Sequence, residues 1–162
     1  RVPSRLAYDA ANLGRQRFRG AFMKKLRIGL VCPYGWDVPG GVQNHVRDLA
    51  EFFIAEGHFV SVLAPVVDEH DLPAYLVNAG KPIGIPFNGA VARLLFNPTA
   101  FARVRNWLTD NEFDILHLHE PAVPSISLLA LWASEGPIVG TFHAQAKKGA
   151  TTRVIASIVE PA

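Results

Sequence analysis

Short apolar segments alternate with longer amphipathic segments along most of this chain. Continuous apolar runs, typical of parallel strands covered on both faces, occupy residues 26–32, 59–64, 113–118 and 138–142, and a shorter strand is expected at 81–86. Helical patterns occupy 41–56, the segment after Asn97, and 125–133, with a last helix expected at 151–159. This alternation predicts an α/β fold, a doubly wound parallel sheet of Rossmann-like type.

The helix that follows Asn97 has a clear start signal. Asn97 is the expected N-cap and Pro98 the expected first helical residue. Its inward face is predicted to consist of three apolar residues, Phe101, Val104 and Leu108. The side that carries Arg103, Arg105 and Trp107 is interpreted as exposed to solvent, with contact to anionic lipid headgroups as the functional alternative.

Polar, glycine and histidine residues follow the predicted strands at their carboxyl ends. They are found at 34–41 after the first strand, at His119 and Glu120 after the strand at 113–118, and at His143 after the last. Ligands of doubly wound sheets bind at this edge. The strand, loop and helix at 26–56 also place backbone N–H groups at a helix N-terminus, where phosphate-bearing ligands are held. We therefore predict the binding site at this edge.

The glycine-rich turn Pro39-Gly40-Gly41 does not fit the motifs of two common nucleotide-binding classes. It is not a G-x-G-x-x-G fingerprint, and no acidic residue ends the strand at 59–64, so a nicotinamide dehydrogenase is disfavoured. The chain also lacks a P-loop lysine, which disfavours hydrolysis of nucleoside triphosphates. Contact of the glycine pair with a ligand and plain turn chemistry both remain open.

The histidines allow a metal interpretation and a simpler one. His117, His119 and Glu120 form an H-x-H-E sequence, and H-x-H ligates metals in some hydrolases. Because only His143 offers a further donor in the pattern, we favour His117 as a hydrogen-bonded core residue and His119 as lining the cleft. His143 directly follows a strand, so its imidazole either bonds a ligand at the sheet edge or only caps the strand.

A predicted turn at 87–89 precedes an exposed arginine. Arg93 is able to clamp a phosphate with two parallel hydrogen bonds, although a single surface arginine usually has no specific ligand. From position alone both interpretations stay open.

Length and composition limit the number of domains, the possibility of a membrane-spanning helix and the chemistry of the cysteine. With 162 residues, 49% of them hydrophobic, the chain suits one domain with a substantial core. No uninterrupted apolar run reaches the roughly 18 residues that a membrane-spanning helix needs. The single cysteine, Cys32, rules out an internal disulfide, fits a reducing compartment, and is interpreted as a small buried residue at a strand end.

The net charge of +2 is distributed unevenly along the chain. Residues 1–22 hold five arginines against Asp9, whereas the rest holds 11 basic and 13 acidic residues, so nucleic acid is not an expected partner. Residues 1–24 are interpreted as a basic, disordered extension, or as sequence upstream of a start at Met23, with lipid contact as the alternative. Residues 25–162 are the predicted domain.

Five segments, taken together, carry a family resemblance: IGLVCPYGWDVPGGVQNHVRDLAE, GHFVSVLAP, PFNGAVARL, FDILHLHEP and GPIVGTFHA. In order and spacing, from about residue 25 to about residue 160, the chain resembles the N-terminal half of the bacterial phosphatidylinositol α-mannosyltransferases. These are retaining, GDP-mannose-dependent glycosyltransferases of the GT-B fold. VPGGVQNHV and HEP…TFH mark the broader class, while CPYGWDVPGG and PFNGAVARL narrow the resemblance to the phosphatidylinositol enzymes.

The resemblance implies roles for individual residues. Gly40 and Gly41 would lie against the pyrophosphate and sugar of the donor, and His143 would approach the transferred mannose as the catalytic residue. Arg103 and Arg105 would help to dock the protein on an anionic membrane. The acceptor would contact five residues, Tyr34, Asp37, Gln43, Asn88 and Arg93.

The implied reaction transfers mannose from GDP-mannose to an inositol hydroxyl of phosphatidylinositol, with retention, on the cytoplasmic face of the cell membrane. Helix N-terminal amides would balance part of the leaving-group charge. A divalent ion is compatible with this reaction, but no tightly bound cofactor and no protein metal site are predicted. Since a GT-B enzyme needs a second domain for most of its nucleotide site, the isolated chain is expected to bind acceptor weakly and to transfer nothing.

Three departures from the family pattern limit what is carried over. Phe87 stands where the family more usually has a tyrosine, and the side of the helix at 103–106 carries fewer basic residues than is usual in the family. The sequence of residues 144–152 differs from the family pattern, so no role is assigned there. The alternatives are a related retaining transferase with another sugar or acceptor, and a non-catalytic lipid-headgroup-binding module. A metal-dependent hydrolase comes last.

Overall fold

The computed structural model describes residues 24–87 and 90–143, apart from the side chains of 85–87 and 90–92. Three predictions lie outside the described residues: the extension before Lys24, the role of Asn88, and the helix at 151–159. Within the described ranges, strands and helices alternate in the order β1 (Arg27–Val31), α1 (Gly41–Ala55), β2 (Phe59–Ala64), β3 (Leu76–Asn78), β4 (Ile83–Phe87), β5 (Ala90–Leu94), α2 (Pro98–Asn111), β6 (Ile115–His119), α3 (Ile126–Ala133) and β7 (Ile138–Thr141).

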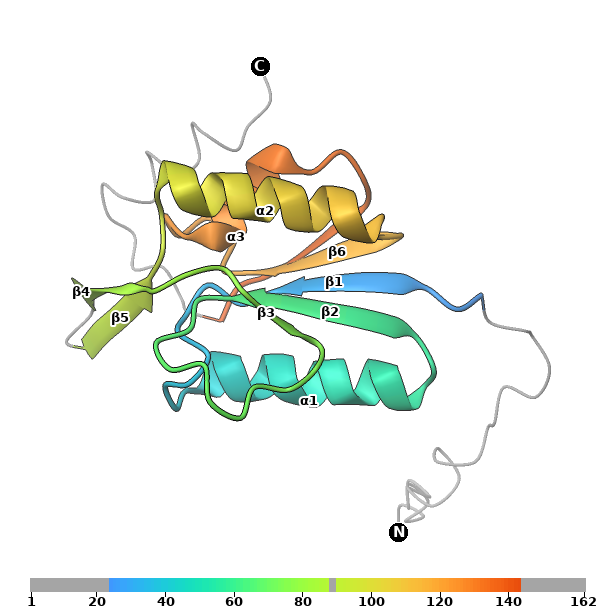
Figure 1. Cartoon of the computed structure of the whole chain (residues 1–162), viewed down its shortest axis with the longest axis horizontal. Helices are drawn as coiled ribbons and strands as arrows, with labels where there is room; N and C mark the ends of the chain where they lie inside the picture. The colour runs from blue at the N-terminus through green and yellow to red at the C-terminus, as the bar shows by residue number, and fades with distance from the viewer. Residues whose placement is uncertain (1–23, 88–89, 144–162) are drawn as a thin grey trace, which may run out of the picture.

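Five of these strands form one parallel sheet in the order β3-β2-β1-β6-β7. Helix α1 covers one face of the sheet, and α2 and α3 cover the other (Figure 1). The predicted Rossmann-like, doubly wound architecture is therefore confirmed, and it is consistent with one domain of a GT-B fold. Among the described residues, no helix is long and apolar enough to cross a bilayer.

The short strand expected at 81–86 is present as β4, but β3 and β5 were not predicted from the sequence. β3 has three residues, which is too short for a periodic signal. β4 and β5 form a separate antiparallel hairpin in which Phe87 pairs with Ala90. The signal for this hairpin is the Asn-Gly pair between the two strands, the strongest short-range hairpin signal in a sequence.

The core lies in two layers, one on each face of the sheet. Beneath α1, Val46 and Ala50 pack on residues of β1 and β2. On the opposite face α2 and α3 pack together over β1 and β6, with Val104 and Ile126 fully buried. Asn97 caps α2 as predicted, because its side chain accepts a hydrogen bond from the N–H of Ala100 at 2.8 Å.

The prediction that Trp107 lies on a solvated side of α2 was wrong. Trp107 is 4% exposed, and its Nε1 donates a hydrogen bond to Oγ of Ser61 in β2 at 2.9 Å. The physical reason is helical spacing: position 107 falls three residues after Val104 and so shares its inward stripe.

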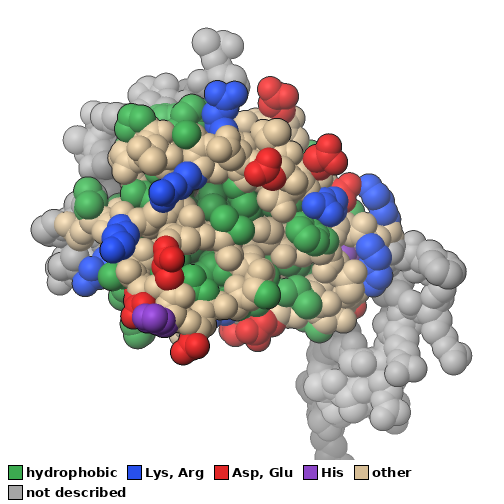
Figure 2. All heavy atoms as spheres, in the orientation of Figure 1, with side chains coloured by type: hydrophobic (Ala, Val, Ile, Leu, Met, Phe, Trp, Pro, Cys, Tyr) green, Lys and Arg blue, Asp and Glu red, His purple; other side chains and the backbone are tan. Residues whose placement is uncertain are grey.

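Arg103 and Arg105 lie on different flanks of α2, because residues two apart on a helix do not face each other. Arg103 donates to the carbonyl oxygen of Ala79, just after β3, at 3.0 Å. Arg105 borders a depression of about 340 Å³ that also includes Phe113 and Pro137, at the amino ends of β6 and β7. On the face shown in Figure 2, basic, acidic and apolar side chains are interspersed.

Cys32 is fully buried, directly after β1, as its sequence position predicts. Burial raises the pKa of its thiol to about 12, so the side chain behaves as a small apolar group.

Candidate functional site

The sheet reverses its strand order between β1 and β6. The chain builds β2 and β3 on one side of β1 and then returns to add β6 and β7 on the other side. The carboxyl ends of the neighbouring strands meet at this point, since Val31 pairs with Leu118 and His119 pairs with Thr141. In open α/β sheets ligands bind in the crevice at such a switch point.

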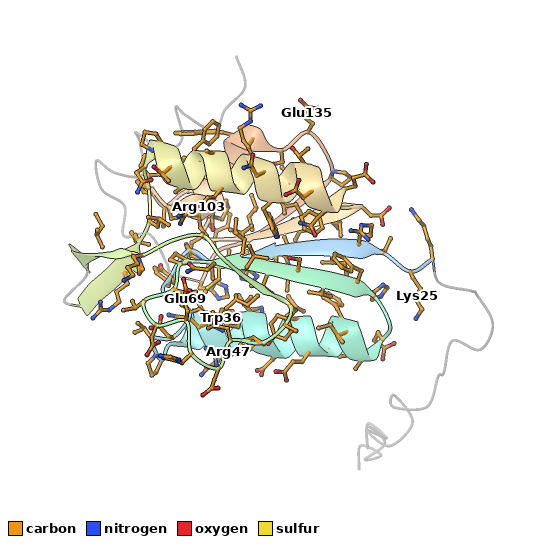
Figure 3. All side chains as sticks on the ribbon, in the orientation of Figure 1. Lys25, Trp36, Arg47, Glu69, Arg103 and Glu135 are labelled. Atoms are coloured by element: carbon orange, nitrogen blue, oxygen red, sulfur yellow. The ribbon has the colours of Figure 1, made fainter. Side chains whose placement is uncertain are left out.

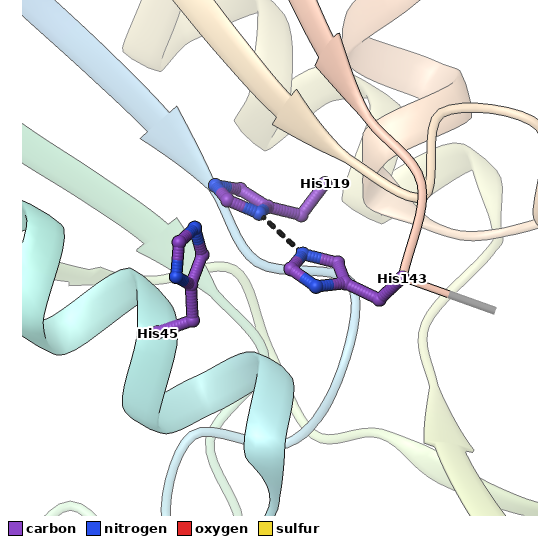
Figure 4. Close-up of side chains that lie close together, drawn as sticks. All are labelled: His45, His119 and His143. Carbon is purple, nitrogen blue, oxygen red and sulfur yellow. Dashed lines mark hydrogen bonds between the residues drawn. The ribbon is translucent and has the colours of Figure 1, made fainter. Parts of the chain in front are cut away.

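Three histidines from three different elements meet at this edge (Figure 4). His45 lies in α1, His119 ends β6, and His143 follows β7. Nδ1 of His119 lies 2.9 Å from Nε2 of His143, and these two rings stack with centroids 5.2 Å apart. The ring of His45 stands edge-on to both, with centroids 5.5 Å and 5.3 Å away. One nitrogen from each ring lies within 4.8 Å of the other two, and we call these residues the histidine cluster.

His117 supports the cluster without joining it. Its ring stacks on that of His119 with centroids 4.4 Å apart, and its Nε2 lies 2.7 Å from Oγ1 of Thr141. The predicted hydrogen bond of His117 is confirmed, but the residue is half-buried and not part of the core. The H-x-H sequence therefore contributes one cluster member and one residue that buttresses it.

Burial determines the protonation of the cluster. Desolvation, with smaller contributions from His117, His143 and His45, lowers the pKa of His119 to about 3. Burial also lowers the pKa of His143, and His45 adds to this effect while Glu120 opposes it. At neutral pH His119 is uncharged, and its Nε2 is buried without a hydrogen-bond partner among the described residues.

Glu120 fixes the backbone that carries His143. Its Oε1 accepts a hydrogen bond from the N–H of His143 at 2.5 Å, and its own N–H donates to the carbonyl oxygen of Thr141 at 2.8 Å. Glu120 is buried and has a φ of 52°, a left-handed conformation that costs a non-glycine residue about 1–3 kcal/mol. Such strain at the end of a strand is common at functional sites.

The loop between β1 and α1 forms the second wall of the site. The N–H of Gly35 donates to the carbonyl oxygen of Arg93 at 3.1 Å, which ties this loop to the β4–β5 hairpin. Trp36 and Arg47 lie against each other beside α1 (Figure 3), with the guanidinium carbon 4.5 Å from the indole centroid. These contacts hold the loop between the helix and the hairpin.

Two of the residues predicted to bind acceptor are engaged within this loop. Gln43 is buried, and its Nε2 donates to the carbonyl oxygen of Gly35 at 3.1 Å. The carboxylate of Asp37 accepts hydrogen bonds from the N–H groups of Val67 and Asp68, both at 3.1 Å. Both side chains therefore order the loop.

Tyr34 and Arg93 are better placed to meet a ligand. Tyr34 is half-buried, and burial, with a smaller contribution from the negative charge of Glu120, raises the pKa of its hydroxyl. Arg93 is exposed, and its guanidinium makes no hydrogen bond or ion pair with the described residues. Since Cβ of Arg93 lies next to Gly35, both residues border the same loop.

The two glycines before and at the start of α1 have different surroundings. A Cβ on Gly40 would lie 2.4 Å from Oε1 of the buried Gln43, whereas a Cβ on Gly41 would meet nothing within 4 Å. Gly40, the N-cap residue of α1, has no side chain to cap the helix, and the first turn holds no acidic residue. The first backbone N–H groups of the helix therefore lie beside open space at Gly41.

His45 was not predicted as a site residue, although it stands within the VPGGVQNHV segment. The available signal was helical spacing: His45 lies four residues after Gly41 and so shares its face of α1. That face points to the sheet edge only because α1 packs across β1, a tertiary feature.

Comparison with known proteins agrees with this architecture. The family model of Glycosyltransferase Family 4 matches residues 39–159. Phosphatidyl-myo-inositol mannosyltransferases of Mycobacterium leprae and Mycolicibacterium smegmatis are 54% and 53% identical over 136 residues, 84% of this chain and 36% and 35% of their own lengths. The same-named protein of Propionibacterium freudenreichii is 43% identical over 125 residues, 73% of this chain and 33% of its own length. The chain thus spans about a third of these curated relatives. It belongs to glycosyltransferase family 4.

Proposed function

We propose that this chain forms the acceptor-binding part of a retaining mannosyltransferase that transfers mannose from GDP-mannose to the inositol of phosphatidylinositol. The observation that carries the proposal is that two features lie close together: the N-terminus of α1, where Gly41 leaves free space, and the ring of His143. His45, one helical turn after Gly41, touches the His143 ring, so both features border one space. The names of the relatives supply the acceptor, phosphatidyl-myo-inositol, and the transferred sugar, mannose, while GDP as the carrier comes from the family resemblance.

The N-terminus of α1 suits the departing phosphate of the donor. Its first N–H groups lack a side-chain cap, and the helix dipole favours negative charge there. Gly41 leaves room for a pyrophosphate or sugar to approach the backbone closely. Gly40 acts differently, because its missing side chain makes room for Gln43. Most of the nucleotide would be held by a second domain, and this chain alone is expected to transfer nothing.

His143 is the proposed catalytic residue, in contact with the transferred mannose. Its ring is exposed at the sheet edge, and a neutral imidazole both donates and accepts hydrogen bonds to sugar hydroxyls. His119 holds the ring through its 2.9 Å contact, and Glu120 holds the backbone, so both are positioning residues. Such support keeps a reacting group within the narrow geometry that transfer requires.

The acceptor is proposed to lie between the β1–α1 loop and the β4–β5 hairpin. Arg93 would pair with the lipid phosphate, and Tyr34 would contact the inositol ring. Arg103 and Arg105 remain the proposed membrane contacts on the cytoplasmic side of the membrane. Because they lie on different flanks of α2, and Arg103 is already bonded to Ala79, we expect each to contribute separately.

The experiment is a chimera in which this chain replaces the matching residues of the Mycobacterium leprae relative. Transfer of mannose from GDP-mannose to phosphatidylinositol supports the proposal, and transfer to another acceptor only would reassign it to a related transferase. A folded chimera that binds phosphatidylinositol vesicles but transfers nothing would favour a binding module.

Two variants of the chimera test the residue roles. His143→Ala should lower kcat by at least about 100-fold, the range typical for loss of a catalytic group. Arg93→Ala should raise KM for phosphatidylinositol with less effect on kcat, because it removes acceptor binding. The matched control is Arg105→Ala, an exposed arginine at the opposite edge of the sheet, which should leave KM for a soluble acceptor analogue unchanged.

A further inference from the structure

We propose that His45, His119 and His143 form a binding site for a divalent transition-metal ion such as Zn²⁺. A second step rests on the proposed function: an ion held there withdraws His143 from the sugar and so inhibits mannosyl transfer.

The geometry of the histidine cluster is close to that of a three-histidine metal site. Zinc binds imidazole nitrogens at about 2.0–2.1 Å, so two nitrogens of a tetrahedral site lie about 3.3 Å apart. The nitrogens of His119 and His143 are 2.9 Å apart, and all three donors lie within 4.8 Å. His45 and His143 are exposed and can close the remaining distance by side-chain rotation, whereas His119 is held by burial.

The charge around the cluster favours a cation. The neighbouring carboxylate of Glu120, which bonds the N–H of His143, adds negative charge.

The donor set selects the class of ion. Imidazole suits zinc, copper and nickel, whereas magnesium and calcium prefer oxygen ligands. Three protein ligands leave a fourth position for water, as in catalytic zinc sites. Since two of the three rings are exposed, an ion reaches the cluster directly from solvent.

His117 is the residue that would orient this site from outside. It stacks on His119 and is itself held by Thr141, so it restricts rotation of the buried ring. Outer partners of this kind tune metal affinity by about 10–100-fold. The H-x-H sequence thus separates into one ligand and one support.

The binding test uses the 162-residue chain itself, titrated with Co²⁺ and Zn²⁺ at neutral pH in a non-chelating buffer. We expect one ion per chain, a cobalt absorption spectrum of low coordination number, displacement by zinc, and no response to Mg²⁺. His45→Ala and His143→Ala remove exposed rings and should each weaken zinc binding by at least about tenfold. Thermal unfolding of the metal-free variants checks that they are folded.

The matched control is His70→Ala, which removes an exposed histidine after β2 and should leave the zinc affinity unchanged. The absence of saturable binding, zinc affinity unaffected by His45→Ala, or binding lost in His70→Ala would each overturn the site.

Inhibition is tested separately, in the active chimera. Zinc should compete with GDP-mannose, EDTA should restore transfer, and His45→Ala should raise the zinc concentration needed for half-inhibition by at least about tenfold. Zinc that binds the chain without inhibiting an active chimera would overturn the second step. Because metal binding is measured on the chain alone, its outcome is independent of whether the chimera transfers mannose.

Discussion

Gln43 in the first turn of α1 donates a hydrogen bond from its Nε2 to the carbonyl oxygen of Gly35, 3.1 Å away across the β1–α1 loop. The side chain is 6% exposed, so solvent does not replace this bond when it is lost. The N–H of Gly35 also donates to the carbonyl oxygen of Arg93 in β5. The hydrogen bond of Gln43 therefore supports both the β1–α1 loop and the contact of this loop with the β4–β5 hairpin.

Gln43→Ala should lower the free energy of unfolding by about 0.5–1.5 kcal/mol, because the carbonyl of Gly35 loses one of its two donors and keeps only the N–H of Val38, at 3.2 Å. Urea denaturation measures this change. Asn44→Ala is the matched control, since Asn44 is the exposed neighbour in the same helical turn, and it should shift stability by less than about 0.5 kcal/mol. Equal effects of the two substitutions would contradict the role of Gln43.

The two glycines at the start of α1 should respond oppositely to alanine. Gly40→Ala places a Cβ against Gln43 and should destabilise the protein by about 1–3 kcal/mol. Gly41→Ala meets no neighbour and should leave stability unchanged or raise it by up to about 1 kcal/mol, as alanine favours the helix.

In the active chimera, Gly41→Ala should nevertheless raise KM for GDP-mannose, because its methyl group occupies the space proposed for the donor. Differential scanning calorimetry and steady-state kinetics on the same samples separate the two effects. A stable Gly41→Ala variant with an unchanged KM for GDP-mannose would show that the donor does not bind next to Gly41.

Trp107 and Ser61 should be energetically coupled. Ser61→Ala leaves the buried indole N–H without an acceptor and should cost about 1–3 kcal/mol, and Trp107→Phe should cost a similar amount. In the double variant the loss should be smaller than the sum, with a coupling energy of about 0.5–3 kcal/mol. Strictly additive losses in a double-mutant cycle would show that this bond contributes no net stability.

Cys32 should make stability fall at alkaline pH. The pKa of its thiol is raised to about 12 in the folded protein, above the ordinary value of about 8.5 in an unfolded chain. Since the unfolded state loses this proton first, stability is unaffected below about pH 8.5 and decreases as pH rises from there toward 12. The difference between wild type and Cys32→Ala, measured by urea denaturation at several pH values, isolates this contribution.

The same burial makes the thiol unreactive. Folded protein should react with a thiol reagent at pH 8 only through unfolding, and denaturant should accelerate the reaction. Rapid modification of the folded protein would contradict the buried position.

The sequence alone determined most of the secondary structure and the architecture. The strand at 59–64 and the cap at Asn97 follow from local rules, namely the apolar run of a covered strand and the fit of a short amide to free helix N–H groups. The alternation of strands and helices then allows few topologies, because parallel crossovers are nearly always right-handed. The position of the candidate site at the carboxyl edge of the sheet follows in turn.

Only the tertiary structure decided which side chains meet. His45, His119 and His143 are brought together because β1, β6 and β7 are neighbours in the sheet and α1 packs across it, a long-range relationship that no local spacing encodes. Packing likewise brings Trp107 to Ser61 of β2 and Arg103 to the carbonyl oxygen of Ala79. Periodicity predicts which face of an element is apolar, but the neighbours of that face depend on strand order and on contacts across the whole fold.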